Sequence, residues 1–122
     1  MNNPLTDNIL LSIKKLLGID QSITDFDSDI IMHINSVFVT LYQMGVGTDK
    51  VYEISSGNET WDEFINDTEY NSVKTYVYLK TKLAFDPPLN GSILESFNKQ
   101  ISELEWRLNF AAEHDVGGDQ NG

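Results

Sequence analysis

The sequence predicts an all-α fold, a small four- to five-helix bundle with a long C-terminal helix and a long central loop or small hairpin. Apolar residues recur at helical spacing in four segments, and glycine or proline follows three of them. With 122 residues, 40% of them hydrophobic, the chain suits one core. We expect a single helical domain over residues 1–114 and a flexible tail over 115–122, where glycines and polar residues offer little to bury.

The first helix is expected over residues 6–17, with Thr6 as its N-cap and Gly18 as its terminator. The second begins at Asp27 or Ser28 and continues until the glycines at 45 and 47 break it. Its apolar stripe comprises Ile30, Ile31, Ile34, Val37, Phe38, Leu41 and Tyr42.

The segment 46–60 is long for a loop. Alternating residues over 51–54 favour one strand of a small hairpin, and an ordinary solvated loop is the alternative. Thr60 and Glu63 have the spacing of a capping box for a short helical turn with three apolar residues, Trp61, Phe64 and Ile65.

A third helix is expected over residues 70–85, and it is apolar nearly all round. Such a helix is buried between layers or shared between subunits, so Leu79 and Leu83 are candidate interface residues. Asp86, Pro87 and Pro88 end it.

The fourth helix is expected to open with a capping box, Ser92 and Glu95, and to run to about Glu113. We expect one end to project, because a helix of this length exceeds a small core. Its core face comprises Ile93, Leu94, Phe97, Ile101, Leu104, Leu108 and Ala111.

Groups that could perform catalysis are scarce, and we expect no enzyme, metal or cofactor. The chain has no cysteine, and His33 and His114 are far apart. The alternating acids Asp25, Asp27 and Asp29 lack the glycine and the final glutamate of a calcium loop, so they are interpreted as charges at a helix N-terminus. No export signal or membrane span is expected.

Trp106 and Phe110 are spaced four residues apart and project opposite the core stripe of the fourth helix. Leaving both in water forfeits burial energy, which favours a partner surface. The alternatives are that the bundle wraps around this helix end or that the helix kinks. Met32 and Val39 repeat the pattern more weakly on the second helix.

Two phrases, LAFDPP at Leu83–Pro88 and ELEWRLN at Glu103–Asn109, resemble head-tail connector proteins of tailed bacteriophages. The resemblance implies a helical, non-enzymatic virion component that is present in the host cytoplasm during assembly. It implies a ring, dodecameric in the virion, that binds the portal protein, extends the DNA channel and docks a tail or stopper protein. The family's C-terminal helix contacts the portal, which here falls on Trp106, Arg107 and Phe110.

The formal net charge of −11 disfavours binding to DNA phosphates or anionic lipid. It indicates either simple solubility or a surface that DNA passes without sticking. An alternative function is an acidic regulatory protein that binds a host or phage protein, for example by mimicking the charge of DNA. A small hydrolase with a carboxylate metal site is a third hypothesis, which lacks a coherent set of ligands.

Overall fold

The computed structural model describes the backbone of residues 4–121 and the side chains of residues 5–113. Two short 3-10 turns, η1 (Pro4–Thr6) and η2 (Trp61–Glu63), accompany four helices: α1 (Ile9–Leu17), α2 (Asp27–Gln43), α3 (Tyr70–Phe85) and α4 (Gly91–Asn121). No strand occurs between residues 4 and 121. The predicted all-α class is therefore confirmed.

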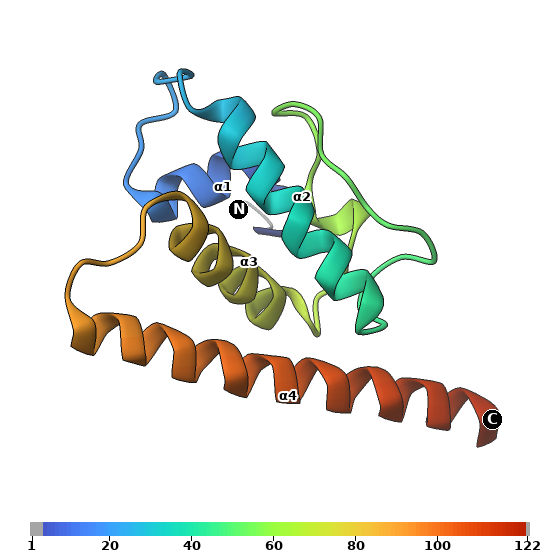
Figure 1. The fold of residues 1–122 in the computed structure, drawn as a ribbon. Helices are drawn as coiled ribbons and strands as arrows, with labels where there is room; N and C mark the ends of the chain where they lie inside the picture. The colour runs from blue at the N-terminus through green and yellow to red at the C-terminus, as the bar shows by residue number, and fades with distance from the viewer. Residues whose placement is uncertain (1–3, 122) are drawn as a thin grey trace.

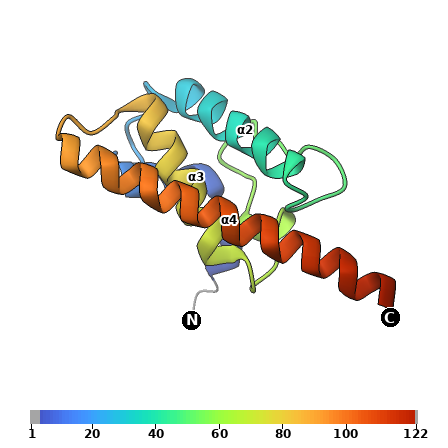
Figure 2. The ribbon, with the colours of Figure 1, turned by 60° about the horizontal axis from the view of Figure 1, so that its bottom comes forward.

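The helices are layered around α3, which packs against α1, α2 and α4. Figure 1 and Figure 2 both show α3 between α2 on one side and α4 on the other. This arrangement explains why the sequence of α3 is apolar nearly all round, because three neighbours cover it. Leu79 is only 3% exposed and belongs to the core of this chain.

Helix α1 begins later than predicted, because Asn8 and not Thr6 is its N-cap. The Asn8 side chain accepts a hydrogen bond from the Leu11 amide at 3.0 Å. Thr6 instead ends the separate turn η1. Gly18 closes α1 in the left-handed conformation at φ 80°, as predicted.

The central segment after α2 contains no hairpin. Ile54 is buried as the alternation predicts, but its backbone pairs with a side chain: its amide donates to Asn35 Oδ1 at 2.8 Å, and its carbonyl accepts from Asn35 Nδ2 at 2.9 Å. At the end of this segment an isolated bridge joins Asn8 and Thr60. This segment, residues 46–60, is thus ordered against the bundle, and we call it the strap.

The predicted capping box at η2 is wrong, although the helical turn itself is present. The Thr60 hydroxyl bonds the carboxylate of Asp62, and Glu63 accepts a hydrogen bond from the Tyr52 hydroxyl at 2.8 Å. Neither side chain caps the turn. Its apolar residues are buried as predicted: Trp61, Phe64 and Ile65.

Helix α4 is capped by Asn90, so the predicted Ser92 and Glu95 capping box is wrong. Asn90 Oδ1 accepts from the amides of Ser92 and Ile93 at 2.8 and 3.2 Å. The helix runs past the predicted end at Glu113 to Asn121, and its C-terminal turns extend beyond the other helices (Figure 2). The flexible tail predicted over residues 115–122 stays a prediction, and the side chains of residues 114–122, His114 among them, lie outside the described residues.

The predicted core face of α4 is only partly buried. Three residues of its middle, Ile101, Leu104 and Leu108, enter the core. Ile93 is 48% exposed, and Leu94 is exposed as well, so the first turns of α4 are less buried than its middle.

Candidate interaction surfaces

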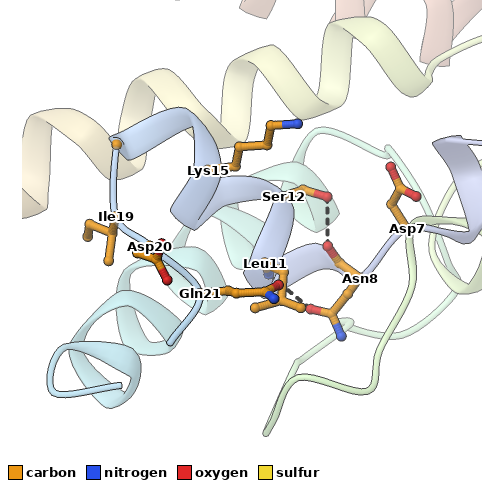
Figure 3. Close-up of a pocket in the computed structure, with 9 residues that line it drawn as sticks. Asp7, Asn8, Leu11, Ser12, Lys15, Ile19, Asp20 and Gln21 are labelled. Atoms are coloured by element: carbon orange, nitrogen blue, oxygen red, sulfur yellow. Dashed lines mark hydrogen bonds between the residues drawn. The ribbon is translucent and has the colours of Figure 1, made fainter. Parts of the chain in front are cut away.

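A hollow with a volume of about 610 Å³ lies along α1. Figure 3 shows its lining, in which the Ser12 hydroxyl donates to the Asn8 carbonyl at 2.7 Å. Ser12 Oγ also accepts a hydrogen bond from the Trp61 indole at 3.2 Å, so this hydroxyl is engaged in structural contacts. The hollow therefore offers no nucleophile activated by a neighbouring base.

The acidic triplet Asp25, Asp27 and Asp29 lies at the start of α2, and its middle residue has a structural role. Lys14 is buried, and its ammonium lies 2.8 Å from Asp27 Oδ1 and donates to the carbonyl of Ile23 at 2.6 Å. These contacts tie α1 to the loop before α2 and to the first residue of α2. Among the described residues, no group of three or more His, Asp or Glu side chains could hold a metal ion.

The hydroxyl of Tyr76 illustrates how the carboxylates of α4 serve packing. It donates to Glu105 at 2.8 Å between α3 and α4. Burial and this carboxylate together raise the pKa of Tyr76, so the phenol stays protonated and keeps its hydrogen bond. Such a pair holds two helices together.

The outer face of α4 carries an aromatic pair in solvent. Trp106 is 66% exposed and Phe110 is 46% exposed. Their rings stack with centroids 5.2 Å apart and an interplanar angle of 22°. Arg107 beside them is exposed too. The alternative that the bundle wraps around this part of α4 is therefore wrong, because no other helix covers these rings.

A second candidate surface lies on α2. Met32 is 58% exposed and Val39 is 40% exposed. Next to them a hollow of about 370 Å³ lies between α2 and α3 and is lined by His33, Ser36, Val37, Thr40, Lys80, Leu83 and Ala84. Of the two leucines predicted for an interface, Leu83 lines this hollow, whereas Leu79 lies in the core.

Sequence reasoning missed exposed apolar residues at the other end of α4. Leu89 is fully exposed in the loop before α4, close in sequence to Ile93 and Leu94. The sequence feature that could have revealed these exposed residues is the double proline at 87 and 88, which ends α3 and places the following residues beyond its last turn.

A family model for the phage connector protein matches residues 9–115. This chain belongs to the phage connector protein family. The connector family is structural and non-enzymatic, and its role is at the junction of phage head and tail, so the chain is a virion component. No curated protein and no solved structure matches this connector.

The match covers all of α2 and α3 and includes both phrases that carried the resemblance. It also includes the strap between α2 and η2. No helix in the described part of this connector has the length and apolar composition needed to span a membrane.

Proposed function

We propose that this connector assembles as a ring on the portal, dodecameric in the virion, where it extends the DNA channel and provides the docking surface for a tail or stopper protein. The exposed stack of Trp106 and Phe110 supports the proposal most directly. It lies on a helix whose opposite face is already buried in this chain, so a further protein surface is needed to cover it.

The burial energy of the exposed aromatic side chains favours association with another protein surface. Covering a large aromatic side chain contributes about 2 kcal/mol or more, and stacked aromatic pairs contribute further. Met32 and Val39 are also exposed, on a helix at the opposite side of α3 from α4. A subunit with apolar residues on two separate sides fits a position between neighbours in a ring.

The charge distribution suits a channel for DNA. Residues 48–69 contain seven carboxylates and a single lysine, Lys50. Much of this segment is fixed to the bundle by Asn35 and by the stacked rings of Tyr52 and Phe64, whose centroids lie 5.2 Å apart. Fixed negative charge repels DNA phosphates, so a wall of this kind lets packaged DNA move without being held.

The test is co-sedimentation with portal rings of the same phage. Trp106→Ala combined with Phe110→Ala is expected to weaken the binding to portal rings at least about tenfold, and so to lower the pelleted fraction, since losing both rings removes more than 1.4 kcal/mol of contact. Helical circular dichroism is expected to stay unchanged, because both side chains are exposed.

The matched control replaces two exposed apolar residues elsewhere, Leu16→Ala with Val51→Ala, and is expected to pellet like the wild type. A wild-type chain that does not pellet with portal rings would contradict the proposed function. Loss of helical structure in the Trp106 and Phe110 double variant would show that these residues support the fold.

A further inference from the structure

The hollow between α2 and α3 has a volume of about 370 Å³, enough for a large side chain. Its lining includes three apolar side chains, Val37, Leu83 and Ala84. That volume lies in the range of pockets that hold a bound group of drug size. His33, Ser36, Thr40 and Lys80 complete the lining.

This hollow is also free of carboxylates, although the chain has 19 of them. Four other hollows of the described surface each have at least one acid in their lining. These acids are Asp7 and Asp20 in the hollow along α1, Asp62, Glu63 and Glu69 in the one near η2, Glu69 in the one that includes Ser72, and Glu103 in the one that includes Asn71. Helix α3 itself carries three lysines and no acid. The hollow therefore favours a partner that presents acid around an apolar side chain.

The outer face of α4 presents that combination. Trp106 and Phe110 stack there, and Glu103 and Glu113 lie three residues before Trp106 and three residues after Phe110. Residues at these spacings share a helix face, and both acids are exposed. A second copy of the chain thus supplies an apolar ridge with acid at each end.

We propose that the hollow between α2 and α3 receives the Trp106 and Phe110 stack of a neighbouring copy, with Glu103 facing Lys80 of the first copy. The inference rests on the proposed ring and names the surfaces by which its subunits meet. Ridge and hollow are different surfaces of one chain, so the contact is head to tail, and a rotation that closes it generates a ring.

Met32 and Val39 fit the same contact. Ser36, in the lining of the hollow, is four residues after Met32 and three before Val39, so the three share one side of α2. The two exposed apolar residues thus border the hollow and extend its apolar surface toward the incoming helix. A contact of this size is small, so it forms transiently between free copies and is strengthened by ring closure.

The experiment uses the absence of cysteine from the natural chain. Ser36→Cys places a thiol at the hollow, and Ser102→Cys places one beside the aromatic ridge. Mixed under mild oxidation at high concentration, the two variants are expected to form a disulfide between residues 36 and 102, identified by peptide mass spectrometry. Either variant alone is expected to give little dimer, because ridge and hollow must come from different copies.

Matched variants sharpen the result. Asn58→Cys, in the exposed strap, serves as the control partner for both thiols and is expected to link to neither. Adding Trp106→Ala and Phe110→Ala to the Ser102→Cys chain is expected to abolish the heterodimer. Lys80→Glu in the Ser36→Cys chain is expected to reduce it about tenfold, and Glu103→Lys in the partner is expected to restore it.

The inference is overturned if Ser102→Cys links to itself or to Asn58→Cys as readily as to Ser36→Cys. It is also overturned if Ser102→Cys links to portal rings and never to Ser36→Cys, an outcome that leaves the proposed function intact. Failure of every cross-link together with failure of the wild type to pellet with portal rings overturns both proposals.

Discussion

Gly47 shows how one residue fixes the path of the chain after α2. Its φ is 101°, a conformation that side chains rarely adopt, and a Cβ at this position would overlap the ring of Phe64. Gly18 also has a positive φ, 80°, but a Cβ there would meet no atom within 4 Å. Comparing substitutions at the two glycines therefore distinguishes the cost of backbone strain from the cost of steric overlap.

Gly47→Ala is expected to lower the free energy of unfolding by about 2–4 kcal/mol, because strain and overpacking add. Gly18→Ala, the matched control, is expected to cost only about 1–2 kcal/mol. Urea unfolding followed by circular dichroism measures both. Equal losses for the two variants would show that the Phe64 ring moves aside without cost.

Glu59 organises the strap through its carboxylate. One oxygen accepts from the Ser55 amide at 2.9 Å and from the Ser55 hydroxyl at 3.0 Å, and the other accepts from the Ser56 amide at 3.3 Å. Burial by itself would raise the pKa of Glu59, but these hydrogen bonds outweigh it and lower the pKa below its ordinary value of 4.5.

A lowered pKa in the folded state means that the ionised carboxylate stabilises the fold above the unfolded pKa, and that this stability is lost as pH falls through the folded pKa. Glu59→Gln is therefore expected to be less stable than the wild type at pH 7, with the difference shrinking below about pH 4. Urea unfolding across this range measures the difference. Glu53 is an exposed acid of the same strap, and we expect Glu53→Gln to differ less from the wild type in stability at pH 7. If Glu59→Gln were destabilised by the same amount at every pH, the ionised Glu59 carboxylate would not be the source of the stability.

At the scale of elements, α4 is attached to the bundle by its middle. Ile101, Leu104 and Leu108 are buried, and the hydroxyl of Tyr76 reaches Glu105 from α3. Ile93 and Leu94 share the apolar stripe but remain exposed. The apolar stripe of α4 is thus longer than the part of α4 that the bundle buries.

Leu104→Ala is expected to lower the free energy of unfolding by about 2–4 kcal/mol, because it leaves a cavity between α3 and α4. Leu94→Ala, the matched leucine of the exposed first turns, is expected to cost less than about 1 kcal/mol. Thermal unfolding of both variants measures the contrast. A similar loss for Leu94→Ala would mean that the first turns of α4 pack as firmly as its middle.

At the scale of the whole molecule, a net charge of −11 opposes both compaction and contact between copies. Salt screens this repulsion, since the Debye length falls from about 30 Å at 0.01 M to about 3 Å at 1 M. Salt also weakens attractive ion pairs such as Lys14 with Asp27 and Lys82 with Asp86, but we expect the excess of 11 negative charges to outweigh them, so that screening gains more than it costs.

Raising sodium chloride from about 0.01 M to about 1 M is therefore expected to raise the urea midpoint of unfolding and to increase self-association. Unfolding curves and analytical ultracentrifugation at matched protein concentrations measure the two effects. A midpoint that falls with salt would show that the attractive pairs outweigh the general repulsion.

The sequence by itself determined the all-α class and the ranges of α2 and α3, because the spacing of apolar residues and the stop signals after them are local properties of the chain. It also indicated the exposed aromatic pair of α4 and, through two short phrases, the connector family. Each of these depends on residues within one helix or one short segment.

The tertiary structure decided what depends on distant neighbours. Asn8 caps α1 in place of Thr6, and distant residues hold the backbone on either side of it: the Ile9 amide donates to the Glu59 carbonyl, and the Asp7 carbonyl accepts from the Trp61 amide. Asn35 fixes Ile54 from 19 residues away, where a strand had been predicted. That Ile101 is buried and Ile93 is exposed follows from how α4 packs on the bundle, and the spacing of apolar residues within α4 carries no information about that packing.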